Sequence, residues 1–125
     1  MSLRLHSVML GVTNLDASVA FYTERLGFTL CGRFEQFAFI EPSSGPEGTA
    51  GGPMLTLSVP LAQARPPVPA PVELVIAVDG VREAYERLRE RGVTFAGEPR
   101  SIDGTNDVAN FTDPDGHVLS LYGPP

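Results

Sequence analysis

Hydrophobic and polar positions repeat one order of segments twice along the chain. In the first half, the run at 5–12 is rich in β-branched and apolar residues and predicts a strand. Apolar residues then recur at helical spacing from Leu15 to Leu26, which predicts a helix. Three more apolar runs complete this half as predicted strands, at 28–32, 35–41 and 54–59.

The second half restarts with the same pattern. A strand is predicted at 72–78, and the helix that follows carries Val81, Tyr85 and Leu88 on one face. Three further strands are expected, at 93–96, 107–112 and 117–122. Each half therefore reads as strand, helix, strand, strand, strand, and the chain is predicted to be an α+β protein built from two such modules.

Polar and glycine residues mark the ends of both predicted helices. Asn14 and Asp79 stand where N-caps are expected, because their side chains can accept a hydrogen bond from a first-turn amide. Gly27 and Gly92 follow the last apolar helical positions and predict left-handed turns at the C-terminal ends. Both helix boundaries therefore fall at equivalent places in the two halves.

One domain with two modules is expected from this organisation. The first module is predicted at 4–59 and the second at 72–123, with a linker at 60–71 between them. Four prolines within 66–71 favour an extended polyproline spacer. The segment 42–53 is rich in Gly, Ser and Pro and predicts a hairpin loop.

Side-chain alternation sorts the predicted strands into two faces. One face is aliphatic in every case, and we expect it to pack beneath the helices. The opposite face mixes small, polar and aromatic groups, a composition typical of the wall of a ligand cavity. Its expected members are Ser7, Met9, Met54, Thr56, Glu73, Ser120 and Tyr122.

Composition narrows the classes of partner. The chain has 125 residues, of which 42% are hydrophobic and 19% charged, as expected of a folded domain. Fifteen acidic residues against nine basic ones give a net charge of −6, which argues against a nucleic-acid partner. No segment approaches a membrane span and the N-terminus lacks the pattern of a signal peptide, so we expect a cytoplasmic protein.

The reactive side chains exclude several chemistries. All nine basic residues are arginine, which leaves no lysine for a Schiff base or a Walker-type phosphate site. Cys31 is the single cysteine, so neither an internal disulfide nor a multi-cysteine zinc site can form. His6 and His117 are the only histidines. The run Asp-Pro-Asp-Gly at 113–116 is typical of a tight turn rather than of a metal site.

These features resemble the vicinal oxygen chelate superfamily, which includes glyoxalase, bleomycin-resistance proteins and extradiol dioxygenases. The resemblance rests on the doubled architecture and on the segments Val-Thr-Asn-Leu at 12–15, Ser-Val-Ala-Phe-Tyr at 18–22, Leu-Gly-Phe at 26–28 and Asn-Phe-Thr-Asp-Pro-Asp-Gly-His at 110–117. It implies the glyoxalase/bleomycin-resistance/dioxygenase fold, in which paired βαβββ modules form a curled mixed sheet around a cavity. It also implies a homodimer and, in metal-dependent members, a divalent ion on the cavity face.

The resemblance places the metal-ligand positions of the family at Ser7, Thr56, Glu73 and Ser120. A catalytic divalent site needs at least three His, Asp, Glu or Cys side chains, and neutral hydroxyls are poor substitutes. We therefore expect no metal and no other cofactor. Asn110 matches a cavity-facing position where some dioxygenases place a catalytic tyrosine, and here it could orient a carbonyl or amide group of a ligand.

His6 is the alternative metal ligand, together with Glu73. A slip of one residue in the first strand would turn His6 toward the cavity. The slip would also turn Val8 and Leu10 away from the helices, at about 1.5–3 kcal/mol for each buried aliphatic side chain. His6 is therefore expected to be a structural or surface residue unless a local β-bulge reverses its direction.

Three functions remain open at this point. The favoured one is metal-independent binding or sequestration of a small organic molecule, because several polar side chains converge on one face. The second is an enzyme: a divalent-metal-dependent lyase or dioxygenase using His6, Glu73 and a third ligand, or a metal-free isomerase with Glu73 as the catalytic base. The third is a purely structural dimer module.

Overall fold

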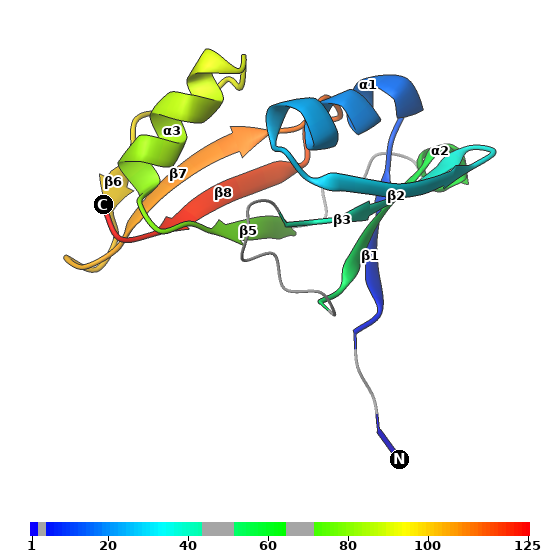
Figure 1. The fold of residues 1–125 in the computed structure, drawn as a ribbon, viewed down its shortest axis with the longest axis horizontal. Coiled ribbons are helices and arrows are strands. Elements are labelled where there is room, and N and C mark those ends of the chain that lie inside the picture. Colours follow the sequence, from blue (N-terminus) through cyan, green and yellow to red (C-terminus); the bar gives the residue numbers. More distant parts are fainter. Residues whose placement is uncertain (3–4, 44–51, 65–71) are drawn as a thin grey trace. The chain divides into compact units, whose positions relative to one another are not determined.

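The computed structural model describes residues 1–2, 5–43, 52–64 and 72–125 (Figure 1). The chain divides into two compact units, Met1–Pro69 and Ala70–Pro125, which we call unit 1 and unit 2. Each unit contains one four-stranded mixed sheet with helices, so the sequence repeat is also a structural repeat. The expected pair of βαβββ modules is confirmed, with one four-stranded mixed sheet in each. No helix in the described parts of the chain is long and apolar enough to cross a membrane.

Unit 1 follows the predicted order of elements. They are β1 (Ser7–Gly11), α1 (Leu15–Ala20), the π-helical turn η1 (Phe21–Arg25), β2 (Thr29–Phe34), β3 (Phe37–Glu41), β4 (Met54–Ser58) and α2 (Val59–Ala64). The strand order in the sheet is β1-β4-β3-β2. The first strand pairs in parallel with the last, and the other pairs are antiparallel.

Unit 2 repeats this topology. Its elements are β5 (Glu73–Ala77), α3 (Val81–Glu90), β6 (Arg100–Ser101), β7 (Asp107–Thr112) and β8 (Val118–Gly123). The strand order is β5-β8-β7-β6, again with a parallel pair formed by the first and last strands. The crossover helix of each unit therefore follows the first strand, as the repeat predicts.

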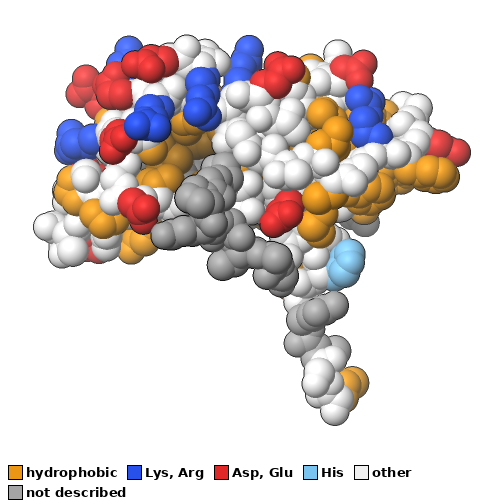
Figure 2. All heavy atoms as spheres, in the orientation of Figure 1, with side chains coloured by type: hydrophobic (Ala, Val, Ile, Leu, Met, Phe, Trp, Pro, Cys, Tyr) orange, Lys and Arg blue, Asp and Glu red, His pale blue; other side chains and the backbone are white. Residues whose placement is uncertain are grey.

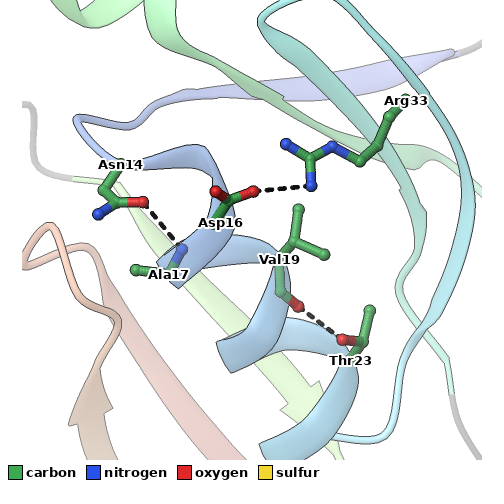
Figure 3. A network of polar contacts seen from close by, with 6 residues as sticks. All are labelled: Asn14, Asp16, Ala17, Val19, Thr23 and Arg33. Atoms are coloured by element: carbon green, nitrogen blue, oxygen red, sulfur yellow. Dashed lines mark hydrogen bonds and ion pairs between the residues drawn. The ribbon is translucent and has the colours of Figure 1, made fainter.

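Polar contacts fix the start of α1, as Figure 3 shows. The Asn14 side chain accepts a hydrogen bond of 3.0 Å from the Ala17 amide, which confirms the predicted N-cap. Asp16 in the first turn forms an ion pair of 2.9 Å with Arg33 of β2. The helix is thereby joined to the strand that follows it in the sequence.

The predicted helix from Leu15 to Leu26 changes its hydrogen-bonding pattern halfway. The Leu26 amide donates to the carbonyl of Phe21, five residues earlier, which is the pattern of a π-helix. The Thr23 hydroxyl donates to the Val19 carbonyl over 2.7 Å in the same region (Figure 3). Gly27 then ends the helix with a φ of 77°, as the sequence predicts.

A short helix replaces part of the expected polyproline linker. Residues 59–64 form α2, where an extended spacer was predicted from 60 to 71. The Ser58 hydroxyl accepts a hydrogen bond from the Leu61 amide, as in an N-cap. Pro60 lies in the first turn, where its missing amide hydrogen leaves no helical bond unmade. The rest of the linker, 65–71, and most of the hairpin loop expected at 42–53 lie outside the described residues.

The start of α3 differs from the prediction that Asp79 caps it. Gly80 occupies the N-cap position, and no side chain caps the helix. The Val81 amide donates instead to the carbonyl of Pro124 over 2.8 Å, which satisfies the amide that a cap would have served. Gly92 ends the helix with a φ of 92°, as predicted.

The strand predicted at 93–96 is reduced to one isolated bridge between Phe95 and Phe111. The two rings lie 5.1 Å apart, so Phe95 serves the core more than a strand ladder. Gly97 and Pro99 follow directly and interrupt the extended run. The edge strand β6 forms later, at Arg100–Ser101.

Each sheet buries one face under its helices, as alternation predicts. Residues of this face and of the helices that cover it are almost fully inaccessible to solvent, among them Leu10, Val12, Tyr22, Ile40 and Leu57 in unit 1 and Val81, Leu88, Phe111, Leu119 and Leu121 in unit 2. The other face of each sheet, which we call the open face, carries the predicted site residues. The helices α1 and α3 cover the aliphatic faces, whereas α2 lies close to Gly11, a position on the open face of unit 1.

Candidate functional site

The open face of unit 1 carries four of the predicted site residues. Ser7 pairs with Met54 across β1 and β4, and Met9 pairs with Thr56, so all four side chains project from the same face. Met9 is exposed, Ser7 and Met54 are half-buried, and Thr56 is buried. Unit 1 therefore brings together two hydroxyls and two thioethers.

The open face of unit 2 brings together the other four. Asn110 of β7 lies opposite Ser120 of β8, and Glu73 and Tyr122 share their face. The Asn110 Nδ2 atom donates a hydrogen bond of 3.2 Å to Glu73 Oε1. Because β8 lies between β5 and β7, this bond joins β5 to β7 across the strand between them. The structure thus links Glu73 to Asn110, a pairing that the sequence did not predict.

Ser120 is the most unusual residue on this face. Its side chain is 1% exposed, and its Oγ atom has no hydrogen-bond partner among the described residues. A buried hydroxyl without a partner costs about 1–3 kcal/mol. Such an unpaired buried hydroxyl is rare in folded proteins, and here it lies opposite Asn110 of the Glu73–Asn110 pair.

A second polar pair holds Tyr122 and was missed at the sequence level. The Tyr122 hydroxyl accepts a hydrogen bond of 3.2 Å from Asn106 Nδ2. The same nitrogen donates to Asp103 Oδ2 over 3.3 Å, and Asp103 Oδ1 accepts from the amides of Asn106 and Thr105. These bonds, the amide of Asn106 first, lower the pKa of Asp103 from its ordinary value of 3.8. The Asp-Gly turn signal at 103–104 was the available clue to this loop.

The metal alternative with His6 does not gain support from the position of that residue. His6 is exposed and precedes β1, and its carbonyl accepts a hydrogen bond from the Met54 amide. It is a surface residue, which is one of the two roles expected for it. The Asp-Pro-Asp-Gly run forms the predicted turn, in which the Gly116 amide donates to the Asp113 carbonyl and Gly116 has a φ of 86°.

The four positions that correspond to metal ligands in the family do not fit a divalent ion. Ser7, Thr56 and Ser120 offer neutral hydroxyls, and Glu73 offers the single carboxylate, which already accepts a hydrogen bond from Asn110. Within the described ranges, no three or more His, Cys, Asp or Glu side chains are grouped so that they could hold a metal. The donor set thus lacks the anionic and imidazole ligands that such a site needs.

Charged side chains of both signs gather on α3. Figure 2 shows basic and acidic groups interleaved over α3, where Arg87 pairs with Glu83 and Arg89 with Glu86. Arg82 of α3 forms an ion pair of 3.0 Å with Asp107, whose side chain is only 3% exposed. Asp107 faces the helix side of its sheet, so it stabilises the packing of α3 and does not belong to the candidate site.

Known proteins resemble this chain over nearly its whole length. Lactoylglutathione lyase from Salmonella typhimurium is 30% identical over 124 residues, which cover 95% of this chain and 91% of the relative. A glyoxalase/bleomycin resistance protein/dioxygenase from Nocardioides has a TM-score of 0.76 and 26% identity, covering 99% of this chain and 85% of the other. TnmS3, an antibiotic binding protein from Streptomyces sp. CB03234, has a TM-score of 0.76 and 25% identity, covering 99% and 98%.

The family assignment rests on the whole chain and not on one motif. The doubled βαβββ topology agrees with these solved structures. The sequence model of the superfamily matches residues 4–121, which include both units. This chain therefore belongs to the Glyoxalase/Bleomycin resistance protein/Dioxygenase superfamily.

Proposed function

We propose that this protein binds a small organic molecule through the open face of unit 2, without a metal ion. The unpartnered, buried Ser120 hydroxyl beside the Glu73–Asn110 pair carries this proposal. Apolar groups surround these polar atoms, since Val75 is 58% exposed and Tyr122 is 37% exposed on the same face. A largely apolar surface with a few convergent polar groups is typical of small-molecule sites.

The resemblance to the antibiotic binding protein TnmS3 supports a binding role. That protein covers almost the same length of chain at 25% identity. The donor set argues in the same direction, because one carboxylate and three hydroxyls are better suited to hydrogen-bonding a ligand than to chelating a cation. Sequestration of a small molecule requires these side chains to bind the ligand but not to catalyse a reaction.

A ligand screen tests this function. We expect at least one compound from a library of small aromatic and heterocyclic molecules to raise the melting temperature, and to bind with a defined stoichiometry in calorimetry. Glu73→Gln and Ser120→Ala should weaken that binding by about tenfold each, the scale of a lost hydrogen bond to a charged or buried group.

Glu90→Gln is the matched control for this screen, because Glu90 is an exposed acid on α3, which packs on the other side of the sheet. It should leave binding unchanged. Binding that is insensitive to both Glu73→Gln and Ser120→Ala would contradict the proposed site.

A lyase is the second candidate function, favoured by the 30% identity with lactoylglutathione lyase. In that case Glu73, exposed on the open face, would act as the base of a metal-free reaction. The test measures turnover of lactoylglutathione with and without added Zn²⁺ or Ni²⁺. Activity that Glu73→Gln abolishes, in a variant that keeps its melting temperature, would favour the lyase over the binding protein.

We also propose that two copies associate, as the resemblance to the superfamily implies. Unit 1 supports this because β2 is an edge strand of its sheet, and Phe34 on it is 64% exposed. Sedimentation should give a mass near twice 13.4 kDa. Phe34→Ser should shift the equilibrium toward the monomer if this edge takes part, whereas a monomeric wild-type protein would refute the association.

A further inference from the structure

Resting on the function proposed above, we propose that the open face of unit 2 selects elongated aromatic ligands of fixed hydrogen-bonding polarity. The ligand carries an acceptor, such as a carbonyl oxygen, at the end that meets Tyr122. It carries a donor, such as a hydroxyl or amine, at the end that meets Glu73. Asn106 is the positioning residue that sets the polarity of the Tyr122 end.

The orientation of the Asn106 amide follows from its neighbour. The Asp103 carboxylate can only accept hydrogen bonds, and it already accepts the amides of Thr105 and Asn106. The atom of the Asn106 side chain that faces Asp103 Oδ2 must therefore be the nitrogen. An inverted amide would place two oxygen acceptors in contact.

The polarity of Tyr122 follows from the orientation of Asn106. The same nitrogen lies 3.2 Å from the Tyr122 hydroxyl, and a side-chain amide nitrogen only donates. The phenolic oxygen consequently accepts this bond, and its own proton is left to point elsewhere. Since Tyr122 lies on the open face, that proton is available to a ligand acceptor.

The Glu73 end has the opposite polarity. Asn110 Nδ2 donates to Glu73 Oε1, which holds the carboxylate over β8 and leaves Oε2 with no hydrogen bond to a described residue. A carboxylate oxygen can accept only from a donor. Between the two ends lies the Ser120 hydroxyl, buried and unpartnered, which can donate to or accept from the middle of the ligand.

The surface between the two ends favours an aromatic body. Val75 and Val118 are exposed on the same face as the Tyr122 ring, and these groups supply apolar contact area. Glu73 pairs with Val118, and Tyr122 lies four residues further along β8. At about 3.3 Å per residue, the Cα atoms of Val118 and Tyr122 are roughly 13 Å apart along the strand. A two-ring ligand with one polar group at each end spans a distance of this order.

A matched series of biphenyls tests this polarity. The full probe is 4-acetyl-4′-hydroxybiphenyl, with an acceptor at one end and a donor at the other. Its controls are 4-acetylbiphenyl, which lacks the donor, 4-hydroxybiphenyl, which lacks the acceptor, and 4-acetyl-4′-methoxybiphenyl, in which the donor is blocked. We expect the full probe to bind the full-length protein at least threefold more tightly than each control, measured by calorimetry.

Variants identify which end of the probe each residue meets. Tyr122→Phe should weaken the full probe by about three- to tenfold and leave 4-hydroxybiphenyl unchanged, because only the carbonyl loses its partner. Glu73→Gln should weaken the full probe more than 4-acetylbiphenyl. Asn106→Ala should reproduce the carbonyl-specific loss of Tyr122→Phe, a pattern that a general loosening of the loop would not give. In the double variant, the two losses should not add.

The outcomes separate this inference from the proposed function. If no biphenyl binds, or if each variant weakens all four probes equally, the polarity is wrong. The proposed function then still stands or falls by the broader ligand screen and its Ser120→Ala variant. If the full probe binds best and the losses of Tyr122→Phe and Asn106→Ala are confined to the acetylated probes, the polarity is supported.

Discussion

Units 1 and 2 share one topology, but equivalent positions on their open faces carry different chemistry. Pairing places Ser7 in unit 1 where unit 2 has Glu73, and Phe39 where unit 2 has Asn110. The hydroxyl between them is kept, as Thr56 in unit 1 and Ser120 in unit 2. Unit 2 therefore has a carboxylate–amide bond over its central strand, where unit 1 has a small hydroxyl and an aromatic ring.

Both units share the same strand topology and the same buried aliphatic face, whereas the residue types on their open faces differ. Burial on the helix side constrains both units alike, because a change of side-chain parity would expose the core. The open faces differ more. Unit 2 joins Glu73 to Asn110 across β8, whereas unit 1 has Phe39 where unit 2 has Asn110.

A substitution at Gly123, where the two units differ in packing, should have the largest effect on stability. Its equivalent in unit 1 is Val59, yet a Cβ atom at Gly123 would collide with the Val78 carbonyl oxygen. Gly123→Ala should therefore lower the free energy of unfolding by about 3 kcal/mol or more, since backbone must move to relieve the contact. Chemical denaturation measures this. Gly97→Ala is the control, because no atom lies within 4 Å of its added Cβ.

If Gly123→Ala proved as stable as Gly97→Ala, the close approach of the end of β8 to Val78 would be wrong. The packing difference between the two units would then lose its main support.

The helix-to-sheet ion pairs of the two units should differ in strength. In unit 2, Arg82 faces a carboxylate, Asp107, that is only 3% exposed, whereas in unit 1 Asp16 is 84% exposed and Arg33 is 41% exposed. Arg82→Gln should destabilise the protein by about 1–2 kcal/mol because it leaves a buried charge unpaired, a cost moderated by the exposure of Arg82 itself. Arg33→Gln should cost less than about 0.5 kcal/mol. Equal losses in denaturation midpoints would contradict this ranking.

Gly11 tests the feature that unit 1 has and unit 2 lacks. The position corresponds to Ala77 in unit 2, but in unit 1 the helix α2 approaches so closely that an added Cβ would lie 3.0 Å from the Ala62 nitrogen. Gly11→Ala should cost about 1 kcal/mol, measured by thermal denaturation. Gly32→Ala in the same sheet, with its nearest atom 4.0 Å away, serves as the control and should be neutral or better.

The loop before β7 gives the smallest expected effect. Hydrogen bonds lower the pKa of Asp103 below its ordinary 3.8, so the folded state is stabilised above that pH, and this contribution is lost as the pH falls through the lowered value. The amide signals of Thr105 and Asn106 in nuclear magnetic resonance should titrate with a midpoint below 3.8. A midpoint at or above 3.8 would show that the loop does not hold the carboxylate as described.

Much of the fold could be predicted because hydrophobic period and capping residues act locally. Asn14, Gly27 and Gly92 end their helices as expected, and β7 has the predicted bounds. The failures depend on contacts distant in sequence. The Val81 amide donates to the Pro124 carbonyl, so Asp79 does not cap α3. Ser58 caps the short helix α2, which the proline-rich sequence after it did not predict.

The face on which each candidate residue lies could be predicted, but the hydrogen bonds between these residues could not. Strand parity identified Glu73, Ser120 and Tyr122 as neighbours on one face, and the structure agrees. The Glu73–Asn110 bond joins residues 37 positions apart. The loop that orients Tyr122 lies 16 positions from it. Hydrophobic periodicity reports only contacts between residues close in sequence, so it could not predict either of these bonds.

In both units the strand synthesised last is hydrogen-bonded along the strand synthesised first. The ladders β1–β4 and β5–β8 cannot form until nearly the whole unit has been synthesised. The chain between the paired strands must also close a long loop, and the entropy lost in that closure opposes the pairing. The pairs β2–β3 and β6–β7 can form earlier, but a two-stranded ladder cannot bury its aliphatic side alone. We therefore expect each unit to complete its sheet only once its last strand is available.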